Sequence, residues 1–261
     1  MGQQVSPLNL ERYELKYLIS PELIDPISRF VESYCSMDYY SVIQSDHFYT
    51  INSLYLDSPS LYLLRYKESA GAFSFNVRIR SYGEGTEPPY FFEVKYKLRE
   101  FVRKKRAKVL LKDWRNILEN ECLPNGMDPY SLTNLEDFLH LKMTYNLGPV
   151  ILTQYRRKAY LSEVDDYARV TFDRDLRYQE MTDWCVSPHE KSLCHYDHPD
   201  SFEEPGKNVV LELKCEKKIP LWMVELIRRF ELVGGSFSKF GNSMATYLGT
   251  PEILSPGVLY R

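Results

Sequence analysis

The sequence lacks an apolar run long enough to cross a bilayer, which requires about 20 residues in a helix. Its N-terminus, MGQQVSPLNL, has neither the basic start nor the apolar middle of a signal peptide. We therefore expect a cytoplasmic protein with no direct insertion into a membrane.

Cysteine is also scarce. The five cysteines are an odd number and show no Cys-x-x-Cys spacing, so neither a disulfide framework nor a thiolate zinc site is indicated. One segment places Cys185 and Cys194 near His189, His195 and His198. Because this segment also carries proline and aspartate and has no hydrophobic period, we interpret it as a long surface loop rather than a metal site.

Strong net charge, internal repeats and low-complexity tracts are absent too. The formal net charge is only −3 and the isoelectric point is near 6.0, which disfavours a nucleic-acid binder. The 261 residues are 44% hydrophobic and include 21 tyrosines and 13 phenylalanines, enough for a substantial core. Short runs of aromatic and β-branched residues favour strands. We expect a single α+β domain over residues 1–261, dominated by antiparallel sheet.

About eight strands are predicted, and helices are expected to pack outside them. Ser20-Pro21-Glu22 and Asp57-Ser58-Pro59 are typical helix starts. Further helical patterns occur around Trp114 to Leu118, around Leu135 to Leu141, and in a last helix from Pro220 to Leu232. The expected strands lie at about 10–19, 48–56, 73–82, 90–98, 102–110, 149–162, 167–175 and 207–216.

Charged residues recur at every second position in five of these strands. The segments are Arg12-x-Glu14-x-Lys16, Arg78-x-Arg80, Glu93-x-Lys95-x-Lys97, Arg169-x-Thr171-x-Asp173 and Glu212-x-Lys214. Because strand side chains alternate between faces, one face of the sheet is charged and the other apolar. For any single strand the charged face is ordinarily just the wet side of a half-buried sheet. The repetition of lysine and arginine instead favours a surface built for a polyanion.

If eight antiparallel strands close, or nearly close, into a barrel, these charges line a tunnel. Unpaired cations in a dry interior are very costly, so the tunnel must be wet and must accept an anion, most naturally phosphate. Glu14, Glu93 and Glu212 could hold Mn²⁺ or Mg²⁺, which prefer oxygen ligands. For Glu14 and Glu93, a simple salt bridge to a neighbouring lysine explains the residue equally well.

The ensemble of motifs resembles the VTC-type polyphosphate polymerase domain, a member of the triphosphate tunnel metalloenzyme or CYTH-like superfamily. The motifs are ERYELKYLI, NSLYLDSPSLYLLRYKE, NVRIRSYG, FFEVKYK, RKKR, YRRKAY, ARVTFDRDL, LELK and FSKF. The resemblance implies an eight-stranded antiparallel β-barrel tunnel that transfers the γ-phosphoryl group of ATP to a growing inorganic polyphosphate chain.

The resemblance also implies roles for individual residues. The expected catalytic cations are Arg78, Arg80, Lys95, Arg157, Arg169 and Lys239. The expected substrate-binding lysines are Lys16, Lys97, Lys108 and Lys214, with Lys108 chosen from the run Arg103 to Lys108. Glu212 resembles the metal-holding glutamate. A further basic residue before NVRIR is either Arg65 or Lys67.

The wider superfamily has Glu-x-Glu-x-Lys where this chain has Arg12-x-Glu14-x-Lys16, which favours the polymerase branch over the triphosphatases. The implied partners are ATP and inorganic polyphosphate or pyrophosphate, with a separate membrane protein for export of the product. Two alternatives stay open: a triphosphate hydrolase with the same tunnel, in which Glu14 or Glu93 orients water, and a polyphosphate-binding module without turnover.

Overall fold

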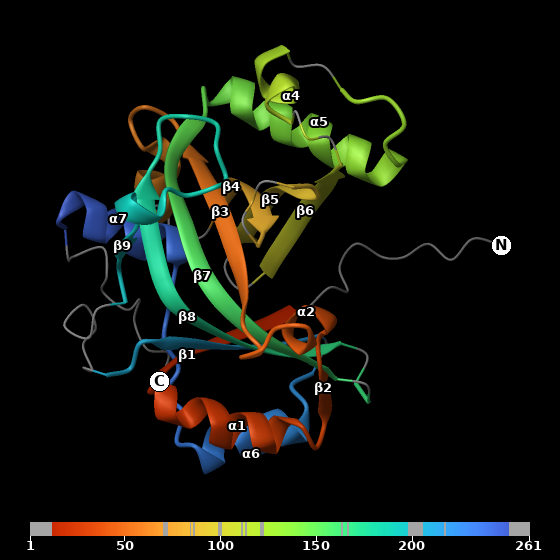
Figure 1. Ribbon diagram of the computed structural model, residues 1–261, viewed down its shortest axis with the longest axis vertical. Coiled ribbons are helices and arrows are strands. Elements are labelled where there is room, and N and C mark those ends of the chain that lie inside the picture. Colours follow the sequence, from red (N-terminus) through yellow and green to blue (C-terminus); the bar gives the residue numbers. More distant parts are fainter. Residues whose placement is uncertain are drawn as a thin grey trace.

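The protein is built on one large antiparallel sheet (Figure 1). The structure is a computed structural model that describes residues 12–69, 73–83, 85, 87–98, 101–110, 112, 114–120, 123–162, 164–165, 167–197, 206–216 and 218–250, without the side chains of residues 12, 67–69, 101 and 102. The candidate residues Cys122 and His198, and the side chains of Arg12 and Lys67, lie outside this description.

Eight strands form the continuous path of the sheet, in the order β1-β10-β8-β7-β3-β4-β5-β6. They are β1 (Arg12–Ile19), β3 (Tyr49–Asp57), β4 (Phe73–Tyr82), β5 (Tyr90–Leu98), β6 (Phe101–Val109), β7 (Gly148–Ser162), β8 (Ala168–Glu180) and β10 (Val209–Glu216). Two short strands, β2 (Cys35–Met37) and β9 (Cys194–His195), pair with β7 and β8. The predicted antiparallel sheet and its β4-β5-β6 meander are confirmed.

The sheet is strongly curved but not closed, since no pairing joins the end strands β1 and β6 within the described residues. Much of the curvature lies in β7 and β8, which bend along their length (Figure 1). A register shift falls between Gln154 and Arg156, which pair with Arg177 and Arg174. The extra residues of β8 include Asp175, whose φ of 53° is left-handed. Such a bulge bends and twists a strand pair, so it helps the sheet to wrap around its charged side.

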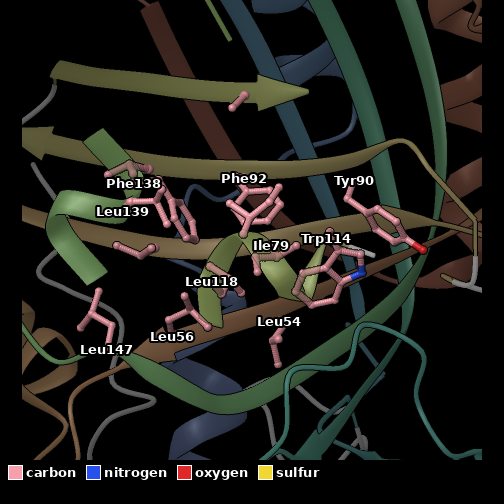
Figure 2. Close-up of a cluster of buried hydrophobic side chains, with 14 of the residues drawn as sticks. Leu54, Leu56, Ile79, Tyr90, Phe92, Trp114, Leu118, Phe138, Leu139 and Leu147 are labelled. Carbon is pink, nitrogen blue, oxygen red and sulfur yellow. The ribbon is translucent and has the colours of Figure 1, made fainter. Parts of the chain in front are cut away.

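Helices cover the convex face in two groups. α4 (Arg115–Asn120) and α5 (Pro129–Thr144) lie against β5 and β6, where Phe92, Trp114 and Phe138 meet in the cluster of Figure 2. A short 3₁₀ turn (Pro21–Leu23), capped by Ser20, leads into α1 (Ile24–Val31), which shares a second core with α6 (Leu221–Arg229) beneath β1, β10 and β8. The predicted placement of helices outside the sheet is confirmed.

The last helix, α7 (Lys239–Leu248), was not predicted, and the expectation that the chain's last helix ends near Leu232 is wrong. Ser238 caps its start and the left-handed Gly249 ends it. α7 packs on the concave side, where Phe240 stacks on Tyr55 of β3 at 4.9 Å between ring centres. Its pattern was missed because glycine, serine and threonine interrupt the apolar residues.

Three smaller differences concern boundaries and loops. β8 continues to Glu180, five residues past its predicted end. α3 (Tyr62–Ser69) begins after the predicted start signal, although Asp57 does accept from the backbone N–H groups of Leu63 and Leu64. α2 (Tyr39–Val42) was not predicted. Across the described residues, none of the helices combines the length and the apolar character needed to span a membrane.

Candidate functional site

The alternating charges converge on one side of the sheet, here called the charged face. Apart from the exposed Lys97 and Lys108, its described basic side chains from the strands are Lys16, Arg78, Arg80, Lys95, Lys104, Arg106, Arg157, Arg169 and Lys214, and its described acidic ones are Glu14, Glu93, Asp173 and Glu212. The strand register aligns them, because directly paired residues point to the same side of a sheet. Lys16 pairs with Glu212, for example, and Glu93 pairs with Arg106.

The charged face is the concave one. Lys95 of β5 donates to Glu14 of β1, with Nζ 3.0 Å from Oε1, although β1 is the first strand of the sheet order and β5 is next to the last. The apolar residues of opposite parity are buried under α4, α5, α1 and α6. α7 adds a tenth cation from above, since Lys239 Nζ lies 2.6 Å from Oδ2 of Asp173.

Glu93 is the centre of the first cluster and is fully buried, with a side-chain exposure of 0%. Arg78 donates to Oε2 at 2.8 Å, and Arg106 donates to Oε1 at the same distance. Lys104 Nζ lies 2.5 Å from Oε1, and Arg80 Nε lies 3.9 Å from Oε2. Burial alone would raise the pKa of Glu93, but Arg80 and its neighbours lower it well below the usual value. One carboxylate therefore holds four cations in place.

Asp173 organises a second cluster. Arg157 makes a bidentate contact to its two oxygens, at 2.6 and 2.8 Å, and Lys239 approaches Oδ2. Burial opposes ionisation of this carboxyl, yet Arg157 and Lys239 lower its pKa to about 2. This bidentate contact fixes the plane of the Arg157 guanidinium and leaves its remaining N–H groups to face a ligand.

Glu14 and Glu212 form a third cluster with lysines. Lys214 Nζ lies 3.0 Å from Glu212, and Lys16 Nζ lies 3.1 Å from Glu14 and 3.9 Å from Glu212. The two carboxyls are within hydrogen-bonding reach of each other. Burial would raise the pKa of Glu212, but Lys214 and Lys16 keep it well below the usual value.

Glu14 and Glu212 fit a hard divalent cation, because two adjacent carboxylates are an ordinary donor set for Mg²⁺ or Mn²⁺. Within the described part of the chain, no group of three or more His, Cys, Asp or Glu side chains is placed to hold a metal. Water or phosphate oxygens would therefore complete the coordination shell, which is common for Mg²⁺.

Two lysines of the charged face have a lowered pKa. Burial lowers the pKa of Lys104 well below its usual value. Lys95 is the second. Burial, followed by repulsion from Lys16, lowers its pKa to about 8, and the attraction of Glu14 offsets only part of this. Lys16, which lies between Glu14 and Glu212, shows the opposite balance. Burial lowers its pKa, but the two carboxylates outweigh burial and raise it.

The structure brings most of the predicted site residues together, but two of them lie apart. Lys97 and Lys108 are on the charged face by register, yet both are exposed and neither forms an ion pair with any described residue. Arg169 lies at an edge of the site, 3.5 Å from Asp38 and 3.4 Å from the hydroxyl of Tyr49. Arg65 is exposed on α3. The choice between Arg65 and Lys67 therefore stays open.

Sequence reasoning assigned no role in the site to four contributors. Asp173 was recognised in the charged alternation of β8, two positions beyond Thr171, but not as the partner of Arg157. Lys104 and Arg106 lie on the charged face of β6. Because five of the six residues in this run are basic, the sequence does not show which of them point to that face. Tyr55, whose hydroxyl accepts from Arg78 at 3.0 Å, gives no signal because β3 has no alternation of charged residues.

Comparison with known proteins agrees with this geometry. The sequence profile of the VTC domain matches residues 11–248, so the chain belongs to the VTC-domain family. The predicted family is thereby confirmed. A search of curated proteins gives no match.

Several solved structures are similar over most of their length. A candidate adenylate cyclase from Vibrio parahaemolyticus shares 10% identity, covering 91% of this chain and 99% of its own, with a TM-score of 0.47. One from Bacillus halodurans shares 14% identity over 87% and 95%, with a TM-score of 0.47. A candidate adenylyl cyclase of Hippeastrum with a dominant triphosphatase activity shares 12% identity over 91% and 96%, again at 0.47. Likeness this remote has no weight in the functional argument.

Proposed function

We propose that this protein is a metal-dependent phosphotransferase that moves the γ-phosphoryl group of ATP onto a growing chain of inorganic polyphosphate. The observation that supports this best is the imbalance of the charged face. Among the described residues, ten cations, including Lys239 and leaving out the exposed Lys97 and Lys108, meet four carboxylates of the strands and Asp38. A concave surface with this surplus favours a multivalent anion. Membership in the VTC-domain family supports the same substrate class.

The chemistry needs no side-chain nucleophile, because the terminal phosphate of the acceptor chain is already ionised. Catalysis then depends on alignment and on neutralising the charge of the in-line transition state. Arg78, Arg80 and Arg157 would hold the oxygens of the triphosphate, since the guanidinium fork matches phosphate geometry. Glu93 and Asp173 fix these forks in advance, so little reorganisation is needed when the substrate arrives.

Lysines would serve the rest of the phosphate chain. Lys16, Lys95 and Lys214 surround the carboxylate pair, and Lys239 adds its charge beside Arg157. Glu14 and Glu212 would hold Mn²⁺ or Mg²⁺, which supplies Lewis-acid neutralisation of the phosphate oxygens when bound. Glu93, a candidate ligand from sequence, is better assigned to the cations, because its two oxygens already face Arg78, Arg80, Lys104 and Arg106.

The test is one reaction that contains purified protein, ATP, Mn²⁺ and a pyrophosphate or short polyphosphate primer. ADP, orthophosphate and chain length are followed together. A ladder of polyphosphate that matches the ADP formed is the expected result. Orthophosphate without a ladder would contradict polymerisation and indicate a triphosphate hydrolase. Tight polyphosphate binding with neither product would indicate a binding module.

A further inference from the structure

Four buried donors on β8 have no hydrogen-bond partner, and two of them lie on the charged face. The hydroxyl Oγ1 of Thr171 and the Nε of Arg169 are inaccessible to solvent and make no hydrogen bond. Thr171 itself is only 1% exposed. Buried polar atoms are nearly always paired, so an orphan of this kind requires an explanation, and its surroundings decide whether that explanation is a ligand. Both donors lie on the charged face, two positions apart along one strand.

The surroundings of Thr171 define what that partner must be. Its neighbours across the sheet are Glu212 and Ala159, and Ala159 presents only a methyl group. Along the strand it lies between Arg169 and Asp173. Arg157 and Lys239 contact Asp173, and Lys16 and Lys214 contact Glu212. A neutral donor among five cations suits an anionic acceptor.

We infer that Thr171 is a phosphate-binding residue, and that its hydroxyl and the Nε of Arg169 form a subsite along β8 for successive phosphates of the chain. Side chains two positions apart on a strand are separated by about 6.7 Å, too far to meet at one oxygen atom. Neighbouring phosphates are therefore the natural acceptors. The subsite rests on the proposed function for the identity of its occupant.

Tripolyphosphate binding without metal tests the inference directly. Titration calorimetry in EDTA compares the wild type with Thr171→Val, which keeps the side-chain shape and removes the hydroxyl, and with Thr171→Ser, which keeps the hydroxyl. Thr171→Val should bind about 10-fold to 100-fold more weakly, as for loss of a hydrogen bond to a charged group. Thr171→Ser should bind within a few-fold of the wild type.

Thr153 offers a matched control. Its hydroxyl is also buried and unpaired on the same face, but its direct neighbours across the sheet are Ser53 and Tyr178 rather than charged residues. Thr153→Val should leave tripolyphosphate affinity unchanged. Both valine variants should unfold at or above the wild-type denaturant midpoint in the absence of ligand, because each removes an unsatisfied polar atom.

The outcomes separate the two proposals. A wild type that fails to bind tripolyphosphate would contradict the proposed function itself. If the wild type binds and Thr171→Val binds equally well, only the subsite is overturned. Equal weakening in the valine and serine variants would also overturn it, since this would assign Thr171 a packing role. Should Thr171→Val not fold, Thr171→Ala is compared with Thr171→Ser in the same titration.

Discussion

Lys95 and Glu14 form an ion pair across the inside of the curved sheet, with the ammonium 3.0 and 3.1 Å from the two carboxylate oxygens. The two residues belong to β5 and β1, which do not pair as strands. The contact therefore joins the two sides of the charged face where no backbone ladder does so. It also places Lys95, whose pKa is lowered to about 8, beside the carboxylate pair of Glu14 and Glu212.

The position of Lys95 predicts a pH dependence of ligand binding. With a pKa of about 8, Lys95 loses its charge as the pH rises from 7 to 9. A bound phosphate favours the charged form, so binding at pH 8 to 8.5 should take up a proton. Calorimetric titration of tripolyphosphate in buffers of different ionisation enthalpy measures this uptake. Lys95→Met should take up fewer protons than the wild type in the same buffers.

The same group also predicts a trend in stability. The folded pKa of Lys95 lies below its unfolded value of about 10.4, so between about pH 8 and 10.4 the unfolded chain binds more protons. The contribution of Lys95 to the free energy of unfolding should therefore rise with pH over this window. Urea unfolding of the wild type and of Lys95→Met at pH 8 and 10 isolates the contribution of Lys95. A difference between the proteins that does not change with pH would contradict the assigned pKa.

Removing Asp173 should be strongly destabilising. The change Asp173→Asn leaves Arg157 and Lys239 buried beside each other, with the more distant Glu212, 3.9 Å from Arg157, as the remaining counter-charge. Loss of one member of a buried pair costs about 3–5 kcal/mol. Because tripolyphosphate supplies the missing negative charge, it should stabilise the variant more than it stabilises the wild type. Urea unfolding with and without tripolyphosphate measures both effects.

A surface pair provides the control for Asp173. Asp137 contacts Lys105, and the two side chains are 36% and 23% exposed. Asp137→Asn should lower the free energy of unfolding by no more than about 1 kcal/mol.

Acid unfolding adds a second check on Asp173. The folded pKa of Asp173 is about 2, below its unfolded value of about 3.9, so its contribution is present above pH 4 and is lost as the pH falls through 2. Asp173→Asn should remove that component.

Alternation in the sequence was enough to predict the sheet, its charged face and most of the cations on it. The sequence placed Arg78, Arg80 and Lys95 on the charged face correctly, because residues two positions apart on a strand point to the same face. Parity alone cannot say where along a strand the site ends, so the sequence could not show that Lys108 is exposed and apart from the ion-pair clusters. For Glu93 the sequence left two roles open, metal ligand and counter-charge, because only distances can distinguish them.

Replacement of Glu14, Glu93 and Glu212 should affect Mn²⁺ affinity differently. Glu212→Gln and Glu14→Gln should weaken Mn²⁺ binding, since each removes one of two charged oxygen donors from the proposed site. Glu93→Gln should leave Mn²⁺ affinity near the wild-type value, because Glu93 is surrounded by cations. Electron paramagnetic resonance of free Mn²⁺ gives the affinities without any need for turnover. Loss of Mn²⁺ binding in Glu93→Gln alone would reverse this assignment.

Replacement of Arg80 should lower turnover far more than it lowers the free energy of unfolding. It is only 7% exposed, and among the described residues the one carboxylate within 4 Å of it is Glu93, at 3.9 Å. Burial and the repulsion of Arg78 oppose its charge, but Glu93 and two neighbouring tyrosines outweigh them and raise the pKa of Arg80. Because the carboxylate of Glu93 is as far as 3.9 Å away, Arg80→Gln should lose little free energy of unfolding, while turnover falls by about 10²-fold to 10³-fold through loss of a preorganised donor to the phosphates.

Arg156 is the matched control for Arg80, because it is an arginine on the convex face of β7 that pairs with the exposed Asp46. Arg156→Gln should leave turnover unchanged. It should lower the free energy of unfolding by no more than a surface ion pair contributes, about 1 kcal/mol. Initial rates of ADP formation and urea unfolding of both variants complete the comparison. Equal turnover in Arg80→Gln and wild type would remove Arg80 from the site. A large loss of stability in Arg80→Gln would show that the cluster on Glu93 serves the fold rather than the substrate.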